Sequence, residues 1–211
     1  MDELIILSVL WVLYCFLHSL LISIPFTRFV KNRMGENFYY YRLFFNIFSL
    51  VTLIPLLYYT YTLREEEFLI WSSYWVYVKY ILIIVAVILL IAGAQGYSFL
   101  QFLGLKQIRD KNVEENDIIS DTLNTSGVLG IIRHPWYAAV ILLLWARDLD
   151  LPGLIVSIIL TLYIIIGTYL EEYKLVRAFG SQYREYKKEV SMLIPFKWVY
   201  KVFFSKKNKV Q

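Results

Sequence analysis

Cysteine and histidine are scarce in this chain of 211 residues, which contains one cysteine, Cys15, and two histidines, His18 and His134. A single cysteine excludes a disulfide within the chain. No Cys/His cluster has the spacing of a metal site, so no metal is expected. The first residues, Met1-Asp2-Glu3, lack the basic region of a secretory signal, and no small-residue cleavage site follows them. We therefore expect the first apolar segment to be retained.

Apolar residues are abundant instead: they make up 59% of the sequence, and the mean hydropathy is +0.56. These values indicate one polytopic membrane domain. The candidate spans are continuously apolar runs at about 4–24, 42–62, 75–96, 135–149 and 152–170. Because these runs do not alternate apolar and polar residues as barrel strands do, we predict an all-α protein with about five transmembrane helices. The fourth and fifth should form a short hairpin.

Lysine and arginine are unevenly distributed among the connections. They concentrate in three segments: Arg28, Lys31, Arg33 and Arg42; Lys106, Arg109, Lys111 and Arg133; and Lys197, Lys201, Lys206, Lys207 and Lys209. The positive-inside rule predicts that these segments are cytoplasmic, which places the N-terminus outside and the C-terminus inside. The same rule accounts for the net charge of +4, so we expect a lipid bilayer, and no nucleic acid, as partner.

A stripe of apolar residues continues beyond the fifth run, with members three and four residues apart: Leu175, Phe179, Tyr183, Tyr186, Val190 and Leu193. Basic residues lie off this stripe. The pattern predicts an amphipathic helix on the cytoplasmic membrane face, broken at Gly180.

Two polar clusters flank the last two apolar runs. Arg133 and His134 precede the fourth run, and Glu171 and Glu172 follow the fifth. Antiparallel helices joined by a short turn bring their outer ends together, roughly 8–10 Å apart between axes. An acidic pair at the end of a helix is disfavoured by the helix dipole, so it calls for a cation, and Arg133 is placed to be one. Titratable groups that meet at a membrane boundary suggest a functional site.

The order of motifs in the C-terminal half resembles a known family. LNTSG at 123–127, RHPWY at 133–137 and EEYKLVRAFGSQYREYKKEVSMLIP at 171–195 are similar to the signature of small integral-membrane methyltransferases, which include isoprenylcysteine carboxyl and phospholipid methyltransferases. HSLL at 18–21, YYRLFFN at 40–46 and LGLKQ at 103–107 resemble the branch with methanethiol S-methyltransferases and NnrU-like proteins. One departure is Leu129, where the family usually has tyrosine.

The resemblance implies S-adenosylmethionine as the methyl donor. Arg133 is expected to hold its carboxylate, and Glu171 or Glu172 to accept from its ribose hydroxyls or ammonium. Further cofactor contacts are expected at Gly93, Gly96, Gly127, His134, Tyr137 and Tyr183. The single domain, 1–211, would then comprise a three-helix part at 1–104, a cofactor-binding region at 122–196 and a basic tail at 197–211.

The predicted reaction is methyl transfer to a small or membrane-partitioned nucleophile, with a thiol as the first choice. A thiol is partly ionised at neutral pH, so a weak base such as His134 or His18 would suffice, and Arg133 completes the predicted catalytic set. His18 is also a candidate substrate contact, as are Arg42 and Asn46, which lie four residues apart on one helix face.

Each candidate also has a structural explanation. Arg133 could anchor the chain at the membrane surface, His134 could cap a helix, and the glycines could allow helices to pack closely. An NADPH-dependent reductase of the sterol-reductase type and a non-catalytic membrane accessory protein stay open as alternatives. The acidic pair argues against the reductase, which needs cations for a 2′-phosphate. A prokaryotic inner membrane is the expected location, while the acceptor and the oligomeric state are left open.

Overall fold

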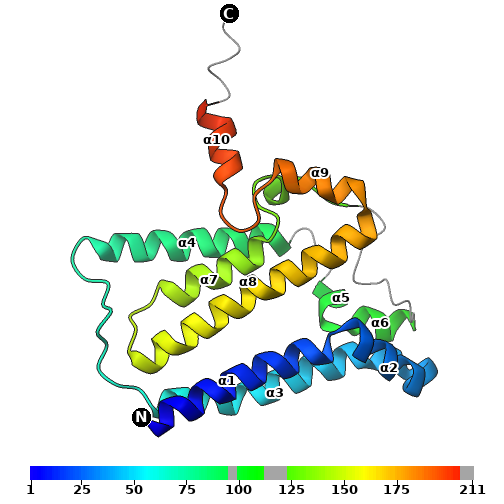
Figure 1. The fold of residues 1–211 in the computed structure, drawn as a ribbon, viewed down its shortest axis with the longest axis horizontal. Coiled ribbons are helices and arrows are strands. Elements are labelled where there is room, and N and C mark those ends of the chain that lie inside the picture. The colour runs from blue at the N-terminus through cyan, green and yellow to red at the C-terminus, as the bar shows by residue number, and fades with distance from the viewer. Residues whose placement is uncertain (95–98, 112–122, 205–211) are drawn as a thin grey trace, which may run out of the picture. The chain divides into compact units, whose positions relative to one another are not determined.

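The computed structural model describes residues 1–94, 99–111 and 123–204, and these residues are largely helical (Figure 1). Four segments are long and apolar enough to cross a membrane: Asp2–Leu21, Ile24–Thr62, Trp75–Ala94 and Leu151–Phe179. Within the described ranges the only strand-like pairings are two isolated bridges. The prediction of an all-α polytopic membrane protein is therefore confirmed.

The long helices are joined by shorter elements. The full order is α1 (Asp2–Leu21), α2 (Ile24–Met34), η1 (Gly35–Tyr40), α3 (Tyr41–Thr62), α4 (Trp75–Ala94), α5 (Phe99–Leu103), α6 (Leu105–Asp110), η2 (Gly127–Gly130), α7 (Pro135–Trp145), α8 (Leu151–Phe179), α9 (Ser181–Glu189) and α10 (Phe196–Phe204). The first predicted loop is thus itself helical. Its helix α2 is preceded by Ser23, whose hydroxyl accepts a hydrogen bond from the Phe26 amide, as expected of an N-cap.

The last two apolar helices differ in length from the prediction. Helix α7 has 11 residues and ends at Trp145 rather than at 149. At 1.5 Å per residue it is about 16 Å long, so it cannot alone cross a hydrocarbon core of about 30 Å. Helix α8 runs past Leu170, the predicted end, to Phe179. The predicted break at Gly180 is present, with a φ of 58° that favours glycine.

The longer α8 corrects one argument about the acidic pair. Glu171 and Glu172 lie about two turns before the end of the helix, whereas the dipole acts mainly within the last turn. The helix continues because its last turns bury apolar side chains, Leu175, Val176 and Phe179, against Tyr183 of α9. Burial, rather than the helix end, is therefore what demands a cation near the carboxylates.

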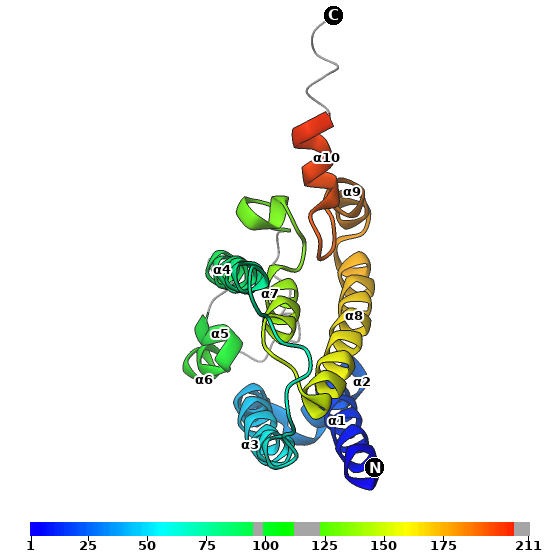
Figure 2. The same cartoon turned by 90° about the vertical axis from the view of Figure 1, so that its left-hand side faces the viewer.

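The chain divides into two compact units, each described here by itself. The first contains α1, α2, α3, α5, α6 and α8 as far as Tyr163; the second contains α4, η2, α7, α8 from Ile164, α9 and α10. In the first unit, α1 and α3 lie side by side (Figures 1 and 2). Leu7 and Trp11 of α1 pack there against Leu56 of α3 and Val156 of α8.

A polar corner between α7 and α8 belongs to the first unit. The Asp150 carboxylate, which is buried, accepts hydrogen bonds from the Gly153 amide at 2.8 Å and the Glu65 amide at 3.2 Å. A backbone bridge joins Leu149 to Leu69, in the connection before α4. Gly153 is required here because a Cβ would lie 2.6 Å from Asp150 Oδ1. The corner thus fastens two connections that are distant in sequence.

In the second unit, α7 packs beside α4 and α9 folds back along the end of α8. The Trp136 indole donates to the Leu90 carbonyl at 3.1 Å. The buried face of α9 consists of Tyr183 and Tyr186, which pack together with Val190 at the end of the helix. This packing fixes the two segments that carry the polar clusters.

Candidate functional site

A short backbone pairing orients Arg133 and His134 at the start of α7. The Arg133 amide donates to the Ser191 carbonyl at 2.9 Å, and the His134 amide donates to the Met192 carbonyl at 3.1 Å. Pro135 then begins the helix, where its missing N–H is not needed. The segment after α9 therefore holds the residues that precede α7.

Glu172 is the centre of the resulting cluster. Its side chain is 2% exposed, and Oε1 accepts from Arg133 Nε at 2.7 Å and contacts Arg133 Nη2 at 2.5 Å. Oε2 lies 2.7 Å from Lys187 Nζ, and His134 Nε2 lies 3.4 Å from Oε1. Because a buried carboxylate is tolerated only when it is paired, the cations Arg133 and Lys187 account for the burial of Glu172.

The guanidinium group of Arg133 is already hydrogen-bonded to other groups of the protein. Its Nη1 donates to the Val190 and Lys187 carbonyls, while Nε and Nη2 bind Glu172. The prediction that a cation compensates the acidic pair is consistent with this arrangement. The predicted fork between Arg133 and a cofactor carboxylate would need some of these contacts to be exchanged, so that role stays a prediction.

Glu171 and Tyr183 differ from Glu172 in having polar atoms without a partner. Glu171 Oε2 is buried and makes no hydrogen bond to any residue that the structure describes, although His134 Nδ1 lies 3.8 Å away. The Tyr183 hydroxyl is likewise buried with no partner in the described ranges. Burial, and then the charge of Glu172, raise the Tyr183 pKa, so its hydroxyl stays protonated. Each buried polar atom left unpaired costs about 1–3 kcal/mol, so two in one cluster call for an explanation.

An aromatic surface adjoins this cluster. The ring of Tyr137 stacks on His134, with centroids 5.5 Å apart and planes 8° from parallel. Tyr137 is 36% exposed, whereas His134 is buried. The arrangement places a partly exposed aromatic ring beside a buried acidic group.

The predicted glycines have different surroundings. A Cβ at Gly93 would lie 2.5 Å from the Trp136 ring, which favours the helix-packing explanation. Gly127 has a φ of 60° with open space around it, so its backbone conformation suffices to explain the glycine. Gly96 lies outside the described residues. Cofactor contact by these glycines stays a prediction.

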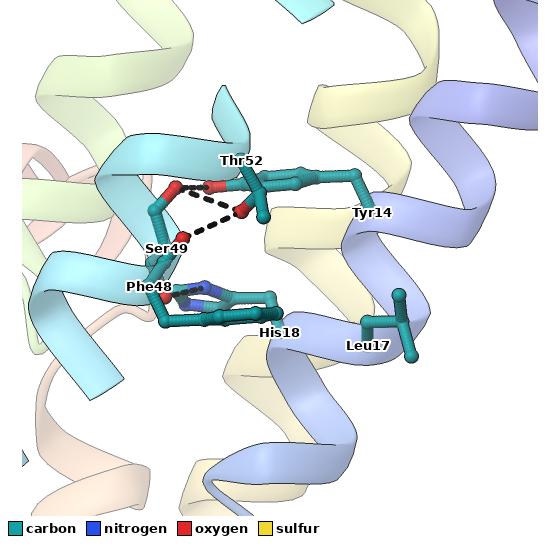
Figure 3. Close-up of a pocket in the computed structure, with 6 residues that line it drawn as sticks. All are labelled: Tyr14, Leu17, His18, Phe48, Ser49 and Thr52. Atoms are coloured by element: carbon teal, nitrogen blue, oxygen red, sulfur yellow. Dashed lines mark hydrogen bonds between the residues drawn. The ribbon is translucent and has the colours of Figure 1, made fainter. Parts of the chain in front are cut away.

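His18 belongs to the first unit, where it lines a small cavity between α1 and α3 (Figure 3). Its Nδ1 lies 3.2 Å from Ser49 Oγ, and its ring packs on Phe45 with centroids 4.9 Å apart. The cavity, of about 30 Å³, is bounded by Tyr14, Leu17, His18, Phe48, Ser49 and Thr52. A space of this size holds about one water molecule. The acceptor role of His18 is untested by this geometry.

Arg42 and Asn46, the other predicted substrate contacts, both reach one backbone group. Arg42 Nε and Asn46 Nδ2 donate to the Phe102 carbonyl at 3.3 and 3.0 Å. Gly104 packs closely against this part of α3, since a Cβ there would lie 2.7 Å from the Leu43 amide nitrogen. These contacts join α3 to α5, in keeping with the structural alternative, and the substrate role stays a prediction.

Sequence reasoning missed Lys187 as a member of the cluster. A signal was present, because Lys187 lies four residues after Tyr183 and hence on the same face of α9. The position of Leu129, where the family usually has tyrosine, also has a partner: the Tyr186 hydroxyl donates to its carbonyl at 2.6 Å.

The spans and the polar cluster describe a polytopic membrane protein with a buried acidic site. Residues 5–148, more than half of the chain, match the family model described as NnrU protein. The chain belongs to the NnrU family. The match includes Arg133 and His134 but ends before Glu171 and Glu172.

Several curated relatives carry the name methanethiol S-methyltransferase. The protein of that name from Pseudomonas deceptionensis is 35% identical over 99 residues, which are 46% of this chain and 37% of the relative. Methanethiol S-methyltransferase 1 of Bradyrhizobium diazoefficiens is 35% identical over 98 residues, or 46% of this chain and 34% of the relative. The Mycobacterium tuberculosis protein is 39% identical over 66 residues, or 31% and 27%.

These alignments span little more than a third of the first two relatives and about a quarter of the third. No solved structure matches the chain significantly.

Proposed function

We propose that this protein is a membrane methyltransferase that moves a methyl group from S-adenosylmethionine to a small thiol. The names of its relatives support the reaction class and the thiol. The structural observation that carries the proposal is a pair of buried atoms, Glu171 Oε2 and the Tyr183 hydroxyl, that have no hydrogen-bond partner among the described residues. They lie beside a cluster whose other charges are already paired, so they are available to a polar ligand.

The described residues fit several groups of the cofactor. Glu171 Oε2 suits a donor, such as the cofactor ammonium or a ribose hydroxyl, and the neutral Tyr183 hydroxyl can donate or accept. The exposed face of Tyr137 suits adenine or the sulfonium cation. For the carboxylate, Lys187 is an alternative to the engaged Arg133, because its ammonium has three donors and is partly exposed.

When bound, the cofactor supplies an electrophilic methyl group. The protein then needs to hold the reactants in line, exclude water and handle one proton. Glu172 acts as a positioning residue, because it fixes both Arg133 and His134 through its Oε1. His134 is a suitable weak base, since a thiol with a pKa near 8.5 already ionises in part at neutral pH. His18 is kept as a second candidate for the acceptor side.

The proposed location is a prokaryotic inner membrane, with the N-terminus outside and the site facing the cytoplasm. The support is the distribution of lysine and arginine. This orientation requires a fifth crossing, in which α7 and the residues that follow it up to Asp150 traverse the membrane together. Cysteine labelling with an impermeant reagent tests it: Glu66→Cys, in a Cys15→Ser background, should be labelled from outside. Labelling of that position only from the cytoplasm would reverse the orientation.

Calorimetric titration of the purified chain tests the function. S-adenosylhomocysteine should bind and NADPH should not. Binding of NADPH alone would favour the reductase, and binding of neither would favour the accessory protein. A transfer assay with methyl-labelled cofactor and methanethiol, a prenylated cysteine or a phospholipid then identifies the acceptor, and methylation of the lipids alone would overturn the thiol.

A further inference from the structure

A second cavity lies in the first unit, and none of its lining residues belongs to the Glu172 cluster. Its volume is about 310 Å³, and its lining comes from the end of α1, one face of α2 and the start of α3: Leu21, Phe26, Val30, Met34, Tyr41 and Phe44. Volumes of about 300–1,000 Å³ are typical of sites that hold small molecules. The His18 cavity, at about 30 Å³, is too small for such a ligand.

The side chains around the larger cavity present an apolar surface. Five of the six are hydrocarbon or thioether groups. The sixth, Tyr41, has its hydroxyl bonded to the Leu21 carbonyl at 2.6 Å, so this polar group is already satisfied. Water in an apolar cavity of this kind would lack hydrogen-bond partners, whereas burial of a hydrocarbon chain there is favourable in free energy.

Helix α2 places positive charge at the rim. Phe26, Val30 and Met34 follow one another at intervals of four, so they form the face that lines the cavity. At about 100° per residue, Lys31 and Arg33 fall on opposite sides of that face. Helix α2 carries no acidic residue.

The two cationic side chains lie against aromatic rings. Lys31 Nζ is 6.0 Å from the centre of the Phe38 ring, and the Arg33 guanidinium carbon is 5.5 Å from that of Phe29. Arg33 is exposed and Lys31 is partly exposed. The aromatic contacts restrain both charged groups beside α2, and their exposure leaves them accessible to an anion.

We propose that this cavity binds one acyl chain of an anionic phospholipid, whose phosphate is held by Lys31 and Arg33. The hydrocarbon lining selects the acyl chain, and the positive charges of Lys31 and Arg33 select the charge of the headgroup. A bilayer supplies such lipids directly to a protein whose described residues include four segments long and apolar enough to cross it. The proposal is independent of methyl transfer, because none of these residues belongs to the Glu172 cluster.

Photo-crosslinking of the purified, delipidated chain tests the proposal. Phosphatidylglycerol with a photoreactive group on its acyl chain should label peptides that contain Val30 or Phe44, at least about fivefold more than phosphatidylcholine with the same chains. Equal labelling by the two lipids, or labelling spread along α1, α3 and α4, would show ordinary lipid contact and overturn the site.

Two variants separate the chain from the headgroup. Val30→Trp fills the cavity and should reduce labelling by both lipids about fivefold or more, while the control Val51→Trp, at a 59% exposed position on α3, should not. Lys31→Gln with Arg33→Gln should remove only the preference for phosphatidylglycerol, and the control Arg64→Gln should preserve it. An equal loss with both tryptophan variants overturns the cavity assignment.

Competition on the unmodified chain needs no variant. Dioctanoyl phosphatidylglycerol should suppress the labelling, and glycerol phosphate at the same concentration should not. Suppression by glycerol phosphate to the same extent would mean that the anion alone is bound, which contradicts a site for the acyl chain.

Discussion

The corner at Asp150 and the cluster at Glu172 both bury a carboxylate, but they use it differently. At the corner, the two Asp150 oxygens accept from backbone amides of two segments, and Gly153 leaves just enough room. At the cluster, Glu172 is paired with side-chain cations, while Glu171 Oε2 and the Tyr183 hydroxyl beside it have no partner in the described chain.

The comparison separates stability from binding. Each Asp150 oxygen already accepts from a backbone amide that the fold supplies, so the burial of Asp150 is explained by the fold alone. The Glu172 cluster is only partly satisfied, which costs stability unless a ligand completes it. Substitutions at the corner should therefore lower stability without changing cofactor affinity, whereas substitutions of the unpartnered groups Glu171 and Tyr183 should lower affinity without lowering stability.

The largest effect is expected for Glu172→Gln. The variant leaves the buried Arg133 and its neighbour Lys187 without a counter-ion, and breaking a buried pair typically costs about 3–5 kcal/mol. The thermal midpoint of the purified protein should fall strongly. The control Glu185→Gln removes an exposed pair with Lys188 and should change stability by less than about 1 kcal/mol. An unchanged midpoint for Glu172→Gln would contradict the central role of this carboxylate.

Gly153→Ala should destabilise the corner. The new Cβ would meet Asp150 Oδ1 at 2.6 Å, and overpacking of this kind costs about 1–3 kcal/mol. S-adenosylhomocysteine affinity of the folded fraction should not change. The matched control Gly167→Ala places a Cβ in open space within α8 and should be neutral or stabilising. Equal midpoints for the two variants would show that the corner is not tightly packed.

Glu171→Gln should show the reverse pattern. The variant preserves shape and removes the charge offered to the ligand, so S-adenosylhomocysteine affinity should fall about tenfold, or about 1.4 kcal/mol. The thermal midpoint without ligand should hold, because Glu171 Oε2 makes no hydrogen bond that would be lost. Titration calorimetry and thermal denaturation on the same preparation measure both quantities. An unchanged affinity would show that Glu171 does not contact the ligand.

Tyr183→Phe should have the smallest effect and the most specific one. Removal of an unpaired buried hydroxyl should raise stability by up to about 1 kcal/mol, because its desolvation is no longer uncompensated. Affinity for S-adenosylhomocysteine should decrease in the same variant. The control Tyr186→Phe removes a hydroxyl that is bonded to Leu129 and should instead lower stability. A Tyr183→Phe protein that is less stable would reveal a structural partner for the hydroxyl.

The sequence predicted the elements of the site better than their pairing. A helical hairpin was enough to bring Arg133 toward Glu172, and the φ required at Gly180 explains the predicted break. The end of α8 could not be placed from hydropathy, because its last turns are polar on one side while Leu175 and Phe179 stay packed. The bond from the Glu65 amide to Asp150 joins residues 85 positions apart, and no local pattern signals it.

The backbone pairing of Arg133 and His134 with Ser191 and Met192 has a consequence for the order of assembly. During synthesis from the N-terminus, both sides of the α7–α8 hairpin emerge before α9 and the segment that follows it. The carbonyl partners of Arg133, at Lys187 and Val190, are therefore synthesised more than fifty residues after it. By then the four candidate membrane spans of the described chain have been made. The site is thus completed as a late step, after the hydrophobic helices already exist.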